Sequence, residues 1–245
     1  FFPEDIQSME ALAFPDEARH SLEEFLTLKS GLLLLTGPAG SGKTTTIYAG
    51  LRHLVEQGGK HIITVEDPVE QVVRGVMQTE INEARGLTFA KAARHLMRQD
   101  PQVLVIGEVR DDETAQIAIR AALTGHLVMS SLHAGSCQGV LERLMLMCPD
   151  NYAVLSSLAL VANQRLVRRL CQNCEGRGCG DCLESGYKDR VPLLEWAKLD
   201  DDVRSRIRKS GPAELKTSVS MQDFARTLVA EGITDQAEIE RAIGS

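Results

Sequence analysis

The segment GLLLLTGPAGSGKTTTIYAGLRHL, residues 31–54, decides the fold. Its apolar run at 32–35 predicts a buried strand, residues 37–44 match G-x-x-x-x-G-K-[ST] at every fixed position, and a helical pattern follows. A strand, this loop and a helix in that order are the context in which the motif forms a phosphate-binding P-loop. The alternative, a glycine-rich turn with an incidental lysine, is less favoured because both flanks match.

The loop predicts binding of ATP or GTP. Its glycines let backbone N–H groups close around phosphate oxygens, and the helix N-terminus adds a favourable dipole. Lys43 is expected to reach the β- and γ-phosphates and Thr44 to hold Mg²⁺. The expected nucleotide-binding residues are Gly37, Pro38, Ala39, Gly40, Ser41, Gly42, Lys43, Thr44 and Thr45.

Three more apolar runs predict strands at 62–65, at 103–106 and within GHLVMSSLHAG, residues 125–135. Because these runs alternate with helical segments, they predict an α/β fold with a mainly parallel sheet covered on both faces. Such sheets bind ligands outside the carboxyl ends of their strands, so polar residues there are expected to share one edge with the P-loop. Those residues are Glu66, Asp67, Glu70, Glu108, His126 and His133.

Each of these polar residues also has a plain structural interpretation. Glu66 and Asp67 could cap the next turn, Glu108 could pair with Arg110, and histidines are often half-buried core residues. Taken together after an intact P-loop, they favour hydrolysis. That reaction needs one group that orients or deprotonates water and another that supports Mg²⁺, and separate strand ends supply both.

The arginines suggest an oligomer. A helix is expected to start after Thr88 and to stop before Pro101, with Arg94 and Arg98 four apart on one face. Together with Arg110 they could form an arginine finger that acts on a neighbouring subunit's nucleotide. The alternative is a solvated basic stripe paired with the acidic residues at 111–113.

The composition excludes other classes of protein. The 245 residues carry a formal net charge of −7 with 43% hydrophobic and 25% charged residues, which is ordinary for a globular protein and gives no broad basic footprint for nucleic acid. The longest nearly apolar run, 153–162, is about half the length that a membrane-spanning helix needs, and it predicts a buried helix. The opening FFPEDIQSMEAL has no secretion signal and suggests that upstream domains are missing.

Several motifs together resemble one family, the secretion ATPases of type II secretion and type IV pilus systems. They are GPAGSGKTTT, TVEDPVE, NQRLVRRLCQNC and the long stretch GLTFAKAARHLMRQDPQVLVIGEVRDDETAQIAIRAALTGHLVMSSLHA. The resemblance spans about residues 15–243 and is far more specific than a lone P-loop. It implies a RecA-like P-loop ATPase core.

The resemblance also implies roles for single residues. Glu70 ends the family's Asp box and is the expected catalytic carboxylate, and Glu108 stands in its Walker B motif where many other P-loop enzymes place Asp. The His box gives His126 and His133 places near the γ-phosphate. Arginines at the positions of Arg94, Arg98 and Arg110 turn toward nucleotide across or within a subunit boundary.

Family members are cytoplasmic homo-hexamers that bind ATP and Mg²⁺. They associate with the inner membrane through partners, act on an inner-membrane platform protein and drive the assembly of a pilus or pseudopilus. A pilus retraction ATPase is the nearest alternative. A RecA-like nucleic-acid translocase should show a basic channel, and a zinc scaffold that does not hydrolyse nucleotide should lack Lys43, Thr44, Glu70 or Glu108.

The stretch CQNCEGRGCGDC predicts a metal site. In the reducing cytoplasm that the resemblance implies, disulfides rarely persist, and C-x₂-C-x₄-C-x₂-C supplies four thiolates from Cys171, Cys174, Cys179 and Cys182 for tetrahedral Zn²⁺. An iron–sulfur cluster and a redox C-x-x-C are the alternatives. Assembly ATPases of the family carry such an element and retraction ATPases generally lack it. This copy is shortened, and it has Asp189 and Pro192 where the family usually shows Gly.

The expected organisation has four parts. Residues 1–30 are interpreted as a linker, 31–165 as the RecA-like ATPase core, 166–195 as the four-cysteine knuckle and 196–245 as a C-terminal helical subdomain.

Overall fold

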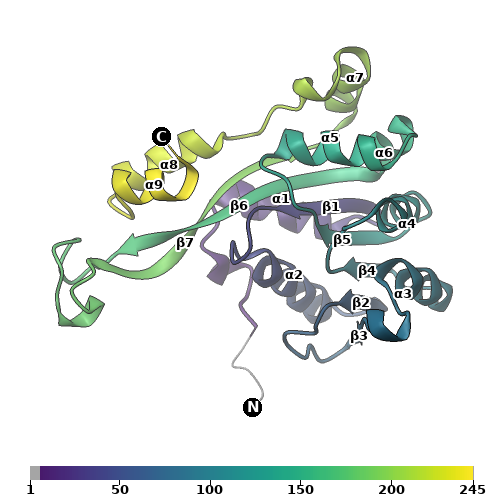
Figure 1. The fold of residues 1–245 in the computed structure, drawn as a ribbon, viewed down its shortest axis with the longest axis horizontal. Coiled ribbons are helices and arrows are strands. Elements are labelled where there is room, and N and C mark those ends of the chain that lie inside the picture. Colours follow the sequence, from purple (N-terminus) through teal and green to yellow (C-terminus); the bar gives the residue numbers. More distant parts are fainter. Residues whose placement is uncertain (1–5, 245) are drawn as a thin grey trace.

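A seven-stranded sheet organises the chain (Figure 1), as a computed structural model that describes residues 6–244 shows. The strand order is β3-β2-β4-β5-β1-β6-β7, in which every neighbouring pair is parallel except β6 and β7. The predicted mainly parallel α/β fold is therefore confirmed. The strands are β1 (Gly31–Thr36), β2 (Ile62–Glu66), β3 (Val76–Glu80), β4 (Val103–Ile106), β5 (Leu127–Ser131), β6 (Leu158–Leu170) and β7 (Tyr187–Lys198).

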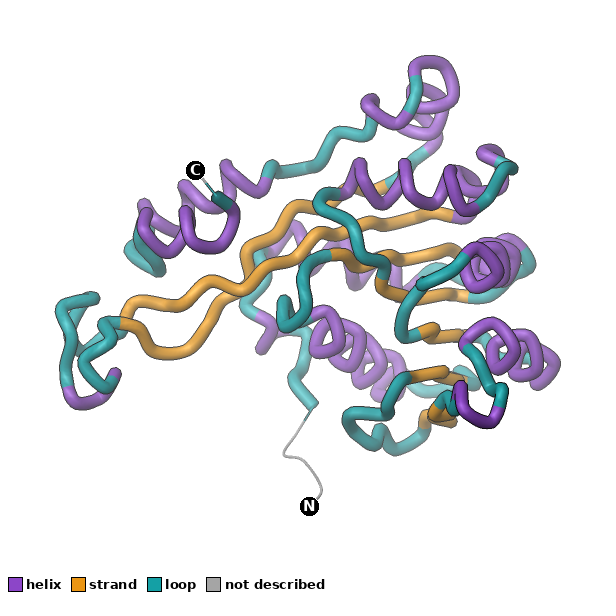
Figure 2. Tube along the Cα trace, viewed as in Figure 1, coloured by secondary structure: helices purple, strands orange, loops and turns teal. Residues whose placement is uncertain are grey.

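Helices cover both faces of the sheet (Figure 2). Side chains alternate along β1, so Leu33 and Leu35 pack with α1 and α2, whereas Leu32 and Leu34 pack with the helices of the opposite face. This two-sided burial explains why the strand is a continuous apolar run. The helices are α1 (Asp16–Thr27), α2 (Lys43–Gln57), α3 (Phe89–Leu96), α4 (Asp112–Leu123), α5 (Cys137–Met147), α6 (Asn151–Ser157), α7 (Asp201–Ser210), α8 (Met221–Ala230) and α9 (Gln236–Ile243).

The first 30 residues are more than a linker. Helix α1 buries Leu22, Phe25 and Leu26 in the same core as α2, so this segment belongs to the folded unit. Residues 1–5 of the expected linker lie outside the described part of the chain.

The apolar run at 153–162 is not one buried helix. Helix α6 ends at Ser157, and Leu158 begins β6, which pairs with β1 on one side and β7 on the other. A short apolar run fits a buried helix or a buried strand equally well, and here it contains the end of one and the start of the other.

Strands β6 and β7 extend beyond the sheet as an antiparallel ribbon (Figure 1), paired from Leu160↔Lys198 to Leu170↔Tyr187. The cysteine stretch forms the tip of this ribbon, and α8 and α9 pack on its side. The expected boundaries at 165 and 195 both fall inside these strands, so the four-cysteine stretch is continuous with the main sheet. Within residues 6–244, no helix has both the length and the apolar character to cross a bilayer.

Candidate functional site

The P-loop joins the end of β1 to the start of α2. Gly42 precedes the helix with φ +88°, and no side chain caps the first turn, which leaves backbone N–H groups available for an anion. Gly37 has φ +136°, and a Cβ there would lie 2.1 Å from the carbonyl oxygen of Gln164 on β6. Only glycine fits such a close approach, so the neighbouring strand shapes the loop.

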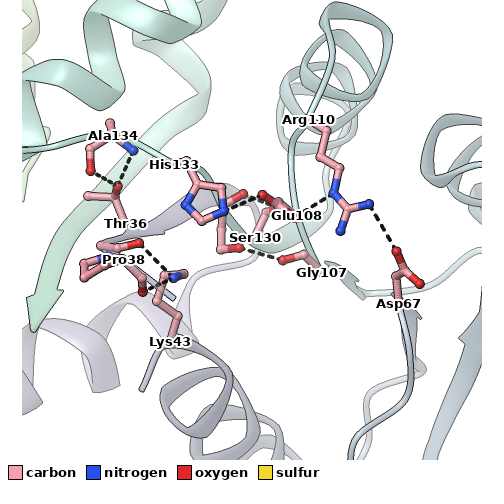
Figure 3. A network of polar contacts seen from close by, with 12 residues as sticks. Thr36, Pro38, Lys43, Asp67, Gly107, Glu108, Arg110, Ser130, His133 and Ala134 are labelled. Carbon is pink, nitrogen blue, oxygen red and sulfur yellow. Dashed lines mark hydrogen bonds and ion pairs between the residues drawn. The ribbon is translucent and has the colours of Figure 1, made fainter. Parts of the chain in front are cut away.

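Lys43 points back into this loop. Its Nζ donates hydrogen bonds of 2.9 Å to the carbonyl oxygens of Gly37 and Pro38 (Figure 3). Burial lowers the pKa of Lys43, and the nearby Glu108 carboxylate opposes that shift. The hydroxyl of Ser41 is buried and has no partner among the described residues. A buried hydroxyl without a partner and a part-buried ammonium fit a loop that receives phosphate oxygens.

A chain of charged groups crosses the carboxyl ends of three strands (Figure 3). His133 Nε2 lies 2.9 Å from Oε1 of Glu108, whose Oε2 accepts a 2.7 Å hydrogen bond from Arg110 Nε. Arg110 also contacts Asp67 Oδ2 at 3.1 Å, and its guanidinium lies over the ring of Phe89. The pairing of Glu108 with Arg110, which was the plain alternative interpretation, is present, and it lies beside the P-loop.

Glu70 differs from the other carboxylates of the site. Its side chain is exposed and has no hydrogen-bond or ion-pair partner within residues 6–244. It lines a cavity of about 250 Å³ that also borders the P-loop, together with Ala39, Gly40, Lys43, Thr44, Ile47, Tyr48, Glu66, Asp67, Pro68, Phe89, Val105, Gly107, Glu108, Arg110, Ser131 and His133. The structure thus brings the P-loop, Glu70, Glu108, Arg110 and His133 around one cavity.

His126 does not join this cavity. It precedes β5, whereas His133 follows it, so the two histidines lie at opposite ends of one strand. The His126 ring contacts the carbonyl oxygen of Ala121 at 3.0 Å near the end of α4. The expectation that both histidines share the nucleotide edge is therefore wrong within one chain.

Arg94 and Arg98 also lie outside the cavity. Helix α3 ends at Leu96, and Arg98 falls in a following 3-10 turn, so the two arginines do not share one α-helical face as expected. Arg94 pairs with Glu113 at 2.6 Å, which is the plain alternative interpretation of this arginine. Both side chains are exposed and remain available to another subunit.

The sequence interpretation missed Tyr48, which lines the cavity from α2 and is only 4% exposed. Its polar partner is Glu66, which the sequence placed at the same edge as the P-loop, with capping of the next turn as the alternative. A tyrosine on the first turns of the helix after a P-loop was the one available signal, because helix periodicity places residue 48 one turn beyond Thr44.

The four cysteines meet at the tip of the ribbon. All four Sγ atoms lie within 4.8 Å of one another, and three of their separations are 3.9, 3.8 and 3.8 Å. A tetrahedral Zn²⁺ with Zn–S bonds of about 2.3 Å separates its sulfur ligands by about 3.8 Å. The backbone N–H groups of Cys179 and Gly186 donate to Cys182 Sγ, as they would to a thiolate. The donor set therefore fits zinc.

Asp189 of β7 has an unusual backbone conformation for a residue other than glycine. Asp189, which stands where the family usually shows Gly, has φ +70°. This left-handed conformation favours glycine, and Asp tolerates it better than most other residues.

The fold and the cavity define a P-loop nucleotide-binding protein of the RecA-like α/β class. The family model described as Type II/IV secretion system protein matches residues 3–241, and the chain belongs to this family.

Individual relatives agree with the family assignment. Type II secretion system protein E of Pseudomonas aeruginosa is 37% identical over 265 residues, which cover 96% of this chain and 53% of the relative. Type II secretion system ATPase E of Vibrio cholerae is 38% identical over 242 residues, covering 86% of this chain and 48% of the relative. The chain thus spans about half the length of these curated relatives.

A solved structure is similar to this chain in both fold and sequence. The pilus retraction motor PilT with bound ADP superposes with a TM-score of 0.80 at 30% identity, covering 98% of this chain and 68% of that one.

Proposed function

We propose that this chain is the ATPase part of a motor that hydrolyses ATP with Mg²⁺ to drive assembly of a pilus or pseudopilus. The observation that carries the proposal is the free carboxylate of Glu70, which faces the same cavity as the P-loop. Membership of the secretion family supports the link to type II secretion or type IV pilus systems.

The proposed chemistry divides the work among the residues of the cavity. Lys43 and the backbone N–H groups of residues 39–45 hold the phosphates, and Thr44 and Glu108 would hold Mg²⁺. The metal neutralises developing charge on the phosphate oxygens when bound. Glu70 orients a water and takes its proton while the water oxygen bonds to the γ-phosphorus and ADP leaves. His133 and Arg110 keep the Glu108 carboxylate in place.

The ribbon tip is proposed as a structural zinc site. Cys171, Cys174, Cys179 and Cys182 would bind the ion as thiolates, and the ion would hold the turn between β6 and β7 rigid. The tip lies far along the ribbon from the P-loop (Figure 1), which suits it to contact partners rather than nucleotide.

The proposed assembly is a homo-hexamer in the cytoplasm, held at the inner membrane through a platform protein and other secretion or pilus components. The exposed Arg94 and Arg98 would face a neighbouring subunit. No nucleic acid is expected as a partner, because the chain has a net charge of −7 and lacks a broad basic footprint.

A retraction motor is the second candidate, favoured by the likeness to PilT. The four-cysteine tip favours assembly instead. Complementation of cells that lack the full-length gene separates the two, since loss of an assembly motor leaves cells without fibres, whereas loss of a retraction motor leaves excess fibres. Release of inorganic phosphate from ATP by the purified chain tests the shared chemistry.

A further inference from the structure

Tyr48 links the P-loop helix to the loop that carries Glu70. It lies on α2, is only 4% exposed, and donates its hydroxyl proton to Oε2 of Glu66. The same hydroxyl oxygen accepts a 3.3 Å hydrogen bond from the backbone N–H of Gln71. One side chain of the P-loop helix therefore contacts both the end of β2 and the residue that follows Glu70.

Glu66 acts as an anchor and not as a free base. Besides Tyr48, its carboxylate accepts hydrogen bonds from Thr64 Oγ1 at 2.5 Å and from Gln78 Nε2 at 3.1 Å. Glu66 is 6% exposed, so its oxygens depend on these protein donors. A carboxylate that already accepts from three side chains is poorly placed to orient water. Glu70, four residues on, has no such partners within residues 6–244.

Gln78 of β3 holds the other side of the same loop. Its Nε2 donates to the carbonyl oxygen of Gln71 at 2.8 Å, and its Oε1 accepts from the N–H of Val73 at 2.7 Å. Gln71 is thus held through its N–H by Tyr48 and through its carbonyl by Gln78. The backbone next to Glu70 is fixed at both polar groups of Gln71, whereas the Glu70 side chain has no partner in the described part of the chain.

We propose that Tyr48 is a positioning residue that holds Glu70 in register with the P-loop, an inference that rests on the proposed role of Glu70 in ATP hydrolysis. The role needs a group that donates to Glu66 and accepts from Gln71 at once, and a hydroxyl does both. Because the side chain begins on the helix that starts with Lys43 and Thr44, the phosphate-binding groups and the water-orienting group share one rigid connection. Placement errors of about 1 Å cost about 100-fold in rate, so such a connection affects turnover more than binding.

The test is Tyr48→Phe, which keeps the ring and removes only the hydroxyl. We expect kcat for ATP hydrolysis to fall about 10- to 100-fold, while KM for ATP and the affinity for a non-hydrolysable ATP analogue stay within about twofold. Tyr152→Phe is the matched control, because it also removes only a hydroxyl. Tyr152 lies on α6, is 65% exposed and does not line the cavity. It should leave both constants unchanged.

A double variant separates positioning from general damage. If Tyr48 acts through Glu70, adding Tyr48→Phe to Glu70→Gln should lower the residual kcat by less than about twofold. A loss in the double variant as large as in the single variant would overturn the inference. So would a kcat of Tyr48→Phe within twofold of wild type, and in that case the proposed hydrolysis would stand. Absence of turnover in the wild-type chain would overturn the proposed function and this inference with it.

Discussion

Nε2 of His133 lies 2.9 Å from Oε1 of Glu108, so residues that follow two neighbouring strands meet beside the P-loop. Glu108 is only 19% exposed at its side chain, and Arg110 contacts its other oxygen. Two groups that contact one carboxylate fix its direction, as the proposed metal-supporting role of Glu108 requires.

Glu108→Gln tests this arrangement. The substitution keeps the shape and removes the charge, so we expect kcat for ATP hydrolysis to fall about 100- to 1,000-fold and the Mg²⁺ concentration for half-maximal rate to rise. Nucleotide binding should remain. The control Glu142→Gln, on the exposed side of α5, should change neither quantity. Unaltered magnesium dependence in Glu108→Gln would remove Glu108 from the metal-supporting role.

Arg98 and Arg110 should differ in a mixing experiment. Arg110 lies in its own chain's cavity, whereas Arg98 is exposed and has no partner among the described residues. If Arg98 acts on a neighbour's nucleotide, the rate should rise faster than linearly with protein concentration. Mixing Arg98→Ala with Lys43→Ala should then restore part of the activity. Mixtures of Arg110→Ala with Lys43→Ala should restore less. Rates strictly proportional to concentration in the range where rings form would contradict the subunit contact.

The ribbon tip should hold one Zn²⁺ per chain in protein purified without chelator. Cys174→Ser should lose the metal and unfold the tip, because a structural zinc site contributes folding free energy directly. ATP affinity should stay within about twofold, since the P-loop packs against β6 near Gln164, outside the four-cysteine tip. Cys148→Ala, outside the cluster, should retain the zinc. A zinc content below about half an ion per chain in the wild type would show that the four cysteines do not bind Zn²⁺.

Glu238 should make stability depend on pH. Burial by itself would raise the pKa of this carboxyl, but hydrogen bonds from Arg241 and Arg168 outweigh burial and hold the pKa at about 2, below the ordinary 4.5. A lowered pKa stabilises the fold above the unfolded value, and that contribution is lost as pH falls from about 4.5 toward 2.

Glu238→Gln isolates this contribution. At pH 7 it should lower the free energy of unfolding by about 3 kcal/mol, because it removes the charge of a buried carboxylate whose pKa the half-exposed Arg168 and Arg241 lower from 4.5 to about 2. The difference from wild type should shrink by about 1.4 kcal/mol per pH unit below about pH 4.5, as measured by urea unfolding. A difference that stays constant across this range would mean that Glu238 keeps an ordinary pKa.

The nucleotide edge could be predicted from sequence because its signals are local. The motif around Lys43 carries its own strand and helix, and β4 is a bare apolar run that the structure reproduces at Val103–Ile106. Strand β3 gave no such signal, since Val76–Glu80 has no buried residue.

Contacts between distant segments could not be predicted in this way. Tyr48 and Glu66 meet only because α2 packs beside the end of β2, and neither periodicity nor spacing encodes that contact. The prediction for His126 was wrong because its position also depends on the sheet, through the direction in which β5 runs. His126 lies before the first residue of β5 and His133 after its last. His126 is therefore at the amino end of the strand, opposite the edge that carries the P-loop.

The central claim is that phosphate binding and water activation belong to separate residues of one cavity. Measuring ATP affinity and ATP turnover for Lys43→Ala and Glu70→Gln tests it most directly. The account predicts that Lys43→Ala loses nucleotide binding, while Glu70→Gln binds ATP within about twofold of wild type and loses about 100-fold or more in kcat. Near-normal turnover by Glu70→Gln would contradict it.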